Sequence, residues 1–151
     1  MKYVANKTGD KVEDRAKIVM TDILSAYSTI DGIWADAGNV ALGALKAMVD
    51  ARRPLIPVTG NDFNGLLKFY EQYKDREPGL DFYLISEPTW ESREALSLMY
   101  KLLNGEKVEK DNIFLPDAIS KENYKEFLKP DLADALFLDT DLPISTLKNL
   151  F

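Results

Sequence analysis

The chain has 151 residues, a formal charge of −6 and neither cysteine nor histidine. Disulfide bonds, thiol nucleophiles, the usual zinc ligands and the commonest general base of enzymes are therefore excluded. The length suits one domain, no basic cluster indicates a nucleic-acid-binding face, and no apolar run approaches the ~20 residues that a membrane-spanning helix needs.

The first third of the chain is expected to form a strand, a helix and a second strand. Residues 3–6 have the composition of a short strand, and residues 33–35 form a second, buried one. Between them, residues 14–27 carry apolar side chains at helical spacing, which predicts one face of a helix. The apolar residues on this face are Ile18, Val19, Ile23 and Leu24.

The middle of the chain continues this alternation. A helix is expected over residues 39–50, a strand over residues 55–59 and a helix over residues 63–74. Pro78 and Gly79 indicate a turn, and residues 82–85 form the next strand.

The last part of the chain begins with a helix over residues 88–103, which Gly105 is expected to terminate. Residues 112–119 are expected to be extended, residues 121–128 to form a short helix, and residues 130–151 to form an irregular tail. Because strands and helices alternate throughout, the pattern predicts an α/β fold with a mainly parallel sheet.

Polar residues follow two of the expected strands. Asp36 and Asn39 come after one strand, and Asn61, Asp62 and Asn64 come after the next. In an open parallel sheet, ligands bind at the carboxyl ends of the strands. The sequence therefore predicts a protein that binds a small molecule rather than one that catalyses a reaction.

Five motifs carry a family resemblance. They are DGIWA, ALGAL, IPVTGNDFNG, YLISEPTW and LLNGEKV. Together the motifs resemble the C-terminal half of the type I periplasmic solute-binding proteins of ABC importers, of the ribose- and galactose-binding kind. The resemblance runs from about residue 3 to the end of the chain. It implies a three-layer α/β sandwich of flavodoxin-like shape, here incomplete.

The resemblance also implies a domain organisation. Residues 1–129 correspond to the C-terminal lobe, residues 88–104 to a helix that crosses to the N-terminal lobe, and residues 130–151 to a C-terminal tail. Intact members of the family have two lobes, so the chain is expected to be a fragment. The segment MKYVANKTGD has no apolar core, so no signal peptide is expected in this chain.

Such a fragment is expected to self-associate. In the family, a strand that is missing here lies between the segments that correspond to residues 3–6 and 33–35, and its absence would expose strand edges. The helix that normally crosses to the other lobe would also lack its partner. Its apolar residues are Leu96, Met99, Leu102 and Leu103. We therefore expect association by exchange of this helix or of an edge strand.

Asp62 is the first candidate for ligand contact. It matches a family aspartate that accepts hydrogen bonds from sugar hydroxyl groups, and a charged acceptor makes the stronger hydrogen bonds. The alternative is that Asp62 caps the following helix, which aspartate does well.

Asp36 and Asn39 are candidates at the end of the preceding strand. Ribose-binding proteins have a sugar-binding asparagine at the position of Ala37, so the alanine departs from the ribose pattern, and Asp36 or Asn39 could compensate for it. Asn39 could equally cap the next helix.

Ser86, Glu87 and Phe63 complete the candidate site. Ser86 stands where the family has a sugar-binding glutamine, and Glu87 could supply the acceptor instead. The alternative for Glu87 is a place in the first turn of the following helix, which the helix dipole favours. Phe63 is expected to face the cleft, where its ring would stack on a sugar.

The remaining motifs support no further chemistry. Trp34 is expected in the core, and Trp90 near the hinge between lobes. Asp139 and Asp141 form a D-x-D in an expected solvated tail and lack a third metal ligand. No G-x-G-x-x-G is present and no serine or threonine has a visible base partner, so neither a cofactor, a metal nor an enzyme activity is expected.

The resemblance implies that the intact protein, in the periplasm or on the cell surface as a lipoprotein, closes two lobes around a monosaccharide and delivers it to an ABC permease. This chain would hold half of the cleft and bind sugar weakly or not at all. One alternative is the effector domain of a lactose-repressor-type regulator, which has the same fold; another is a small flavodoxin-like enzyme. The tail FLKPDLADALFLDTDLP favours the transport protein, because such tails are typical of it.

Overall fold

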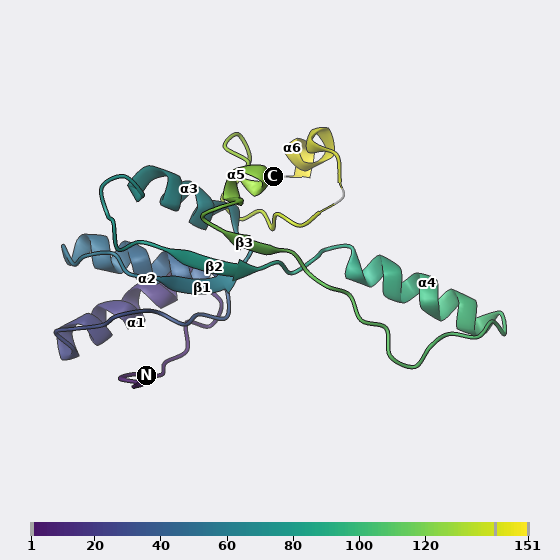
Figure 1. Ribbon diagram of the computed structural model, residues 1–151, viewed down its shortest axis with the longest axis horizontal. Coiled ribbons are helices and arrows are strands. Elements are labelled where there is room, and N and C mark those ends of the chain that lie inside the picture. Colours follow the sequence, from purple (N-terminus) through teal and green to yellow (C-terminus); the bar gives the residue numbers. More distant parts are fainter. Residues whose placement is uncertain (1, 141, 151) are drawn as a thin grey trace.

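The computed structural model describes residues 2–140 and 142–150, with side chains up to residue 148 in the last helix. Strands and helices alternate along most of the chain (Figure 1). The elements are α1 (Glu13–Ala26), α2 (Gly38–Asp50), β1 (Val58–Asn61), α3 (Asn64–Tyr73), β2 (Phe82–Ile85), α4 (Glu91–Leu103), β3 (Ala118–Ser120), α5 (Tyr124–Phe127) and α6 (Ile144–Leu150). None of the helices in the described residues is both long and apolar enough to cross a lipid bilayer.

The sheet has the strand order β1-β2-β3. β1 and β2 are parallel, with Val58 opposite Phe82, and β2 and β3 are antiparallel, with Leu84 opposite Ile119. Ile33 adds a parallel bridge to Val58 on the outer side of β1. The predicted α/β fold is confirmed, with a small mixed sheet.

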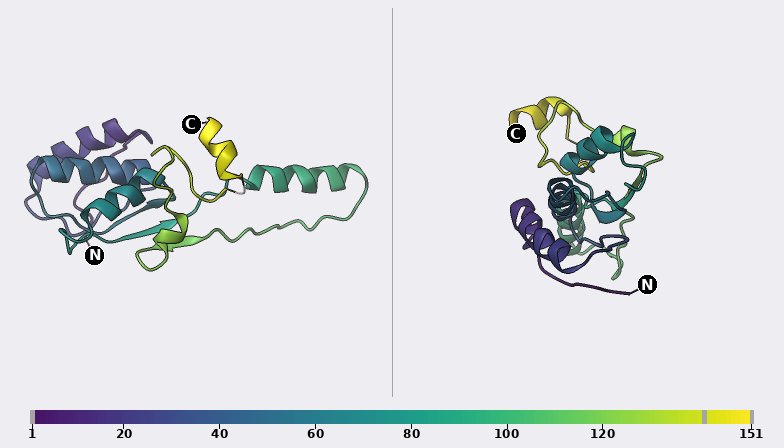
Figure 2. Two further views of the ribbon diagram at one scale, coloured as in Figure 1. Left: turned by 90° about the horizontal axis from the view of Figure 1, so that it is seen from above. Right: turned by 90° about the vertical axis from the view of Figure 1, so that its left-hand side faces the viewer.

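The side chains of β2 show that helices cover one face of this sheet. Phe82 and Leu84 are buried, whereas Tyr83 and Ile85 on the opposite face are 56% and 45% exposed. The ring of Tyr70 from α3 packs edge-on against Phe82, with the centroids 4.7 Å apart. α1, α2 and α3 lie side by side in one layer (Figure 2). The sandwich is therefore incomplete, as expected, and no helix of the described chain covers its other face.

α2 is the central helix of this layer, and its small residues allow the close approach of its neighbours. A Cβ atom on Gly43 would lie 2.2 Å from the backbone oxygen of Glu13, which no real Cβ contact allows. The motif ALGAL thus has a structural reason, because its glycine is where α1 crosses α2 in contact with the backbone.

Gly43→Ala should destabilise the domain. Alanine is a better helix former than glycine by about 1 kcal/mol. That gain is opposed by a clash with a backbone atom, which cannot move aside as a side chain can, so we expect the free energy of unfolding to fall by about 1–3 kcal/mol. Gly32→Ala is the matched control, since its Cβ would meet only Pro57 O, at 3.5 Å. Urea unfolding measures both, and an unchanged midpoint for Gly43→Ala would contradict this account.

The first predicted strand does not form, and the second is reduced to a single bridge. Residues 3–6 form no strand, and no backbone hydrogen bond joins them to another part of the described chain. Residues 33–35 keep only the Ile33 bridge, because the hydroxyl of Thr59 takes up the N–H and C=O of Ala35, each at 3.1 Å. The strand expected over residues 55–59 begins three residues later, after Pro57, which has no N–H to donate.

The helix α4 extends away from the rest of the molecule (Figure 1), and none of its residues is buried. It begins at Glu91, three residues after the predicted start at Pro88. Its end is as predicted: Gly105 has a φ of +78°, its N–H bonds to Leu102 O at 3.1 Å, and the N–H of Glu106 bonds to Lys101 O at 3.0 Å. Its expected apolar face is exposed.

The C-terminal segment is not the irregular tail that the sequence predicted. It contains α6, and it contributes four buried leucines to the core. These are Leu132, Leu136, Leu138 and Leu147. Asn64, which is fully buried, holds this segment, because its Nδ2 donates to Lys129 O at 2.8 Å and to Ala133 O at 3.0 Å. These four leucines therefore pack the C-terminal segment against the core.

Candidate ligand-binding site

A cavity of about 840 Å³ lies where β1 and β2 end, and we call it the strand-end pocket. The amino ends of α1 and α2, the ends of both strands, the start of α4 and the C-terminal segment contribute to it. Its lining residues are Lys11, Glu13, Ala37, Asn39, Asn61, Phe63, Glu87, Pro88, Thr89, Glu91, Ser92, Ala135 and Phe137. The pocket is at the sheet edge where the sequence placed ligand binding, and it contains three of the predicted residues.

Asn61 and Glu87 form a hydrogen-bonded pair in the strand-end pocket. The Nδ2 of Asn61 donates to Glu87 Oε2 at 2.5 Å, and its Oδ1 accepts the N–H of Gly38 at 2.6 Å. Asn61 therefore satisfies a free amide in the first turn of α2 while it holds a carboxylate at the pocket wall. Glu87 is exposed, and its Oε1 accepts no hydrogen bond within the described residues. The sequence marked Asn61 as a polar strand end but not as a site residue.

Asp62 is closed off from the pocket. Its side chain is 0% exposed, and its carboxylate accepts three backbone N–H groups: Glu87 at 2.6 Å, Leu138 at 2.6 Å and Asp139 at 2.8 Å. It does not cap α3 either, because Phe63 occupies that position and no side-chain cap bond forms. The predicted direct contact with a ligand does not fit this geometry, since all donors to the carboxylate are backbone amides.

Burial and hydrogen bonding act in opposite directions on Asp62. Burial raises the pKa of its carboxyl group above the ordinary value, because the charged form loses its hydration. The N–H groups of Asp139, Glu87 and Leu138 oppose that rise, because they favour the charged form.

Ser86 is also turned away from the pocket. It is buried, and its hydroxyl donates to Asp139 Oδ2 at 2.8 Å. The other oxygen of Asp139 accepts the indole N–H of Trp90 at 3.0 Å. The expectation of a solvated Asp139 is therefore wrong, whereas Asp141 lies outside the described residues. Trp90 is placed at the start of α4, where the sequence put the hinge.

Asn39 and Asp36 differ in their position. Asn39 lines the strand-end pocket, and its Nδ2 donates to Lys11 O at 2.7 Å, which holds the segment before α1. It does not cap α2, because Ala37 is the cap residue and no side-chain cap bond forms. Asp36 is exposed and does not line the pocket.

The aromatic candidates are divided between two surfaces. Phe63 lines the strand-end pocket and packs edge-on against Phe137, with the ring centroids 6.3 Å apart. No sequence signal indicated Phe137, which comes from the C-terminal segment. Trp34 is 77% exposed and lies outside both the core and the pocket. Its predicted place in the core is wrong, because no element of the described chain covers that face of the sheet.

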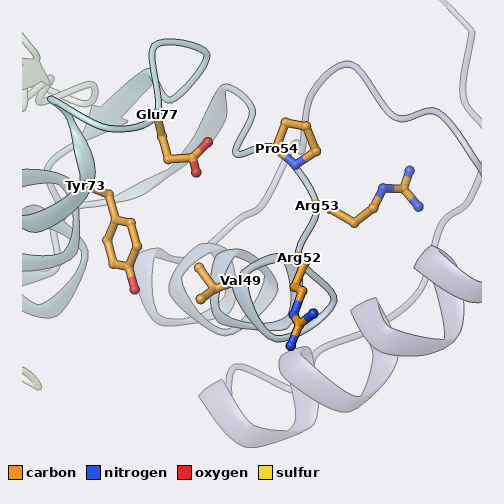
Figure 3. A pocket seen from close by; sticks show the side chains of 6 residues that line it. All are labelled: Val49, Arg52, Arg53, Pro54, Tyr73 and Glu77. Atoms are coloured by element: carbon orange, nitrogen blue, oxygen red, sulfur yellow. The ribbon is translucent and has the colours of Figure 1, made fainter.

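A second cavity, of about 350 Å³, lies at the opposite end of the strands (Figure 3). It is lined by Val49, Arg52, Arg53, Pro54, Tyr73 and Glu77. Its polar groups hold loops: Arg53 donates to Ser28 O, and Glu77 accepts the N–H of Leu55 at 3.3 Å. We therefore place the site in the strand-end pocket. In the described residues, no group of three or more acidic side chains could hold a metal ion.

No protein-family model matches the chain. A xylitol-binding protein of Mycolicibacterium smegmatis is 29% identical to it over 126 residues, which are 82% of this chain and 34% of that protein. A crystal structure from Mycobacterium smegmatis, in complex with β-D-fucofuranose, matches with a TM-score of 0.67 and 24% identity, over 84% of this chain and 41% of that one. An ABC transporter periplasmic solute-binding protein of Actinobacillus succinogenes, with bound D-allose, matches with a TM-score of 0.62 and 25% identity. The match covers 83% of this chain and 44% of that protein.

These similarities confirm the resemblance to the C-terminal lobe of type I periplasmic sugar-binding proteins, and with it the fold class. The chain spans 34% of the length of the curated relative and less than half of the two solved structures. Two of these three similar proteins are named as binding proteins, one for xylitol and one as a periplasmic solute-binding protein.

Asp62→Asn should destabilise the domain. The new amide would direct an N–H toward a backbone N–H, so at least one buried donor would lose its acceptor, at a cost of about 1–3 kcal/mol. The control is Asp131→Asn, because Asp131 is exposed and does not line the strand-end pocket.

The same pair tests the pH dependence. Because burial raises the folded-state pKa of Asp62 above its unfolded value, the folded protein binds this proton more tightly. The contribution of this proton to the free energy of unfolding is complete below the pKa that Asp62 has in the unfolded chain. It is lost as the pH rises through the pKa of Asp62 in the folded protein. Acidification from neutral pH should therefore widen the stability difference between the parent chain and Asp62→Asn. Urea titrations at several pH values measure this difference in the free energy of unfolding. A difference that stays constant or narrows on acidification would contradict a raised pKa of Asp62.

Proposed function

We propose that this chain binds a monosaccharide or a related polyol as the C-terminal lobe of a solute-binding protein of an ABC importer. The observation that carries the proposal is the strand-end pocket, in which Asn61 and Glu87 present an amide and a carboxylate at the ends of two parallel strands. It is supported by the similarity to a xylitol-binding protein, to a solute-binding protein with bound D-allose and to a structure in complex with β-D-fucofuranose.

The chemistry of the pocket suits an uncharged ligand with many hydroxyl groups. Glu87 offers a charged acceptor, which makes stronger hydrogen bonds than a neutral one. Thr89 and Ser92 add hydroxyl groups, and the rings of Phe63 and Phe137 add an apolar wall. We assign direct contact to Asn39, Asn61, Phe63 and Glu87. Asp62 and Ser86 shape the pocket from behind it.

The whole protein in this proposal works in the periplasm, passes its ligand to an ABC permease and catalyses no reaction. Two of the proteins reported above are named for binding or transport. No specific feature of the described residues favours the lactose-repressor-type effector domain.

Sugar titration tests the site. We expect amide NMR signals of the pocket residues to shift saturably with one member of a panel of pentoses, hexoses and polyols, at weak affinity, because one lobe supplies half of the contacts. Glu87→Gln should weaken that affinity at least about tenfold, because the ligand loses a charged acceptor.

Asp131→Asn serves as the control and should leave the affinity unchanged, since Asp131 is exposed and is not part of the pocket. If the amide NMR shifts were instead centred on Arg52 and Arg53, the ligand would bind in the second cavity and not in the strand-end pocket. No saturable shift with any member of the panel would overturn the sugar assignment.

We also propose that the chain self-associates through the open sheet face, which we define as Trp34, Tyr83 and Ile85. These three side chains are 77%, 56% and 45% exposed and lie on the face that no helix of the described chain covers. Next to them, the outer edge of Ile33 offers strand backbone for pairing with a second copy.

Sedimentation velocity over a concentration series tests this. The parent chain should shift from monomer to dimer as its concentration rises, and Tyr83→Lys should shift the midpoint at least tenfold higher, because it places a charge in the buried interface. Leu115→Lys is the control for an exposed apolar residue that lies outside the sheet. Leu103→Lys tests association through α4 instead, because it would shift the midpoint concentration only if that helix formed the interface. A parent chain that stays monomeric throughout would sink the proposal.

A further inference from the structure

Three segments far apart in the sequence meet where the chain leaves the domain for α4. They are the end of β1 at residues 61–63, the exit segment at residues 86–90, and residues 137–139 of the C-terminal segment, which comprises residues 130–140 and 142–148 of the described chain. Asp62 links all three, because its carboxylate accepts the N–H of Glu87 from the exit segment and those of Leu138 and Asp139 from the C-terminal segment.

Asp139 binds the exit segment a second time. Its Oδ2 accepts the hydroxyl of Ser86 at 2.8 Å, and its Oδ1 accepts the indole N–H of Trp90 at 3.0 Å. Its backbone oxygen accepts the N–H of Thr89 at 3.2 Å. The side chain of Asp139 therefore fixes both ends of the exit segment, Ser86 and Trp90. Between them, the N–H groups of Glu87 and Thr89 are held by the Asp62 carboxylate and by the backbone oxygen of Asp139.

These contacts fix two structures that have few other supports. α4 starts one residue after Trp90 and buries no residue of its own, so its direction depends on the segments that join it to the domain. Trp90 also packs edge-on against Phe114 of the returning segment, with the ring centroids 5.7 Å apart, so the position of Trp90 bears on both connections. The same segments supply two walls of the strand-end pocket: Glu87, Pro88 and Thr89 form one, and Ala135 and Phe137 form the other.

We infer that Asp62 and Asp139 form a carboxylate clasp, a pair of positioning residues that sets the direction of α4 and the separation of two pocket walls. The part that concerns the pocket rests on the function proposed above. Carboxylates suit this role, because each oxygen can accept more than one hydrogen bond and an ionised acceptor makes stronger bonds than a neutral one.

The absence of cysteine allows a direct test of the direction of α4 in the ligand-free chain. Spin labels go on Gln72→Cys in α3 and Ser97→Cys in α4, both exposed positions. Pulsed electron paramagnetic resonance should give one narrow distance distribution for the parent chain. Asp139→Ala should widen it at least twofold, and Asp139→Asn, which keeps one acceptor, should fall between the two.

Trp90 gives an independent readout of the clasp. Trp34→Phe leaves Trp90 as the one tryptophan in the chain. In that background, Asp139→Ala should shift the Trp90 emission to longer wavelength and raise its acrylamide quenching constant at least twofold. Asp131→Ala, an exposed carboxylate in the same segment, should change neither the emission nor the distance distribution.

Circular dichroism establishes that the Asp139 variants are folded, which separates a positioning role from loss of structure. An Asp139→Ala chain that is folded and keeps both the parent distance distribution and the parent Trp90 emission would overturn the clasp. If it unfolds, Ser86→Ala together with Trp90→Phe removes the same two donors and must widen the distribution, or the inference fails. These readouts need no ligand, so failure of sugar binding with an intact clasp would count against the proposed function alone.

Discussion

The buried carboxylate of Asp62 organises the end of the sheet that matters for binding. An ionised group without water must be compensated by hydrogen bonds, or its burial costs several kcal/mol. Its donors come from residues 25, 76 and 77 positions further along the chain. Satisfying one side chain therefore requires the exit toward α4 and the C-terminal segment to meet at the end of β1. The buried leucines of that segment add the apolar contacts that keep it there.

The sheet has two faces with different surroundings, and this asymmetry explains the rest of the shape. On one face, α2 lies between α1 and α3 and the core is closed by Phe82 and Leu84. The contact of Gly43 with the backbone of Glu13 fixes how closely α1 can approach. On the other face, Trp34, Tyr83 and Ile85 remain exposed. The folded core therefore does not need the second face to be covered, but burying that apolar area would favour association.

Local features of this fold were predictable, and features that depend on distant partners were not. β2 and α3 follow from alternation and helical periodicity within about ten residues, and Gly105 ends α4 as its conformational freedom predicts. The prediction of a strand at residues 33–35 was wrong, because the hydroxyl of Thr59 takes the place of backbone pairing at Ala35. Of the candidate site residues, Glu87, Phe63 and Asn39 line the strand-end pocket, because strand ends can be located from sequence, and their contact with a ligand stays a prediction. The burial of Asp62 and Ser86 depends on the C-terminal segment, which carries no periodic signal.

The hydrogen bond between Asn61 and Glu87 preorganises one wall of the strand-end pocket. Asn61 holds one oxygen of Glu87 in place, so the carboxylate loses little freedom when its other oxygen accepts a hydroxyl group. Preorganisation of this kind raises affinity, because fewer side chains must be ordered on binding. In the proposed function this lobe supplies one half of the cleft, so a ligand held by this chain alone would keep its other face in water. On that proposal, the affinity of this chain would be limited by the number of contacts and not by their geometry, and a second surface that covers the ligand would add hydrogen bonds to groups already in position.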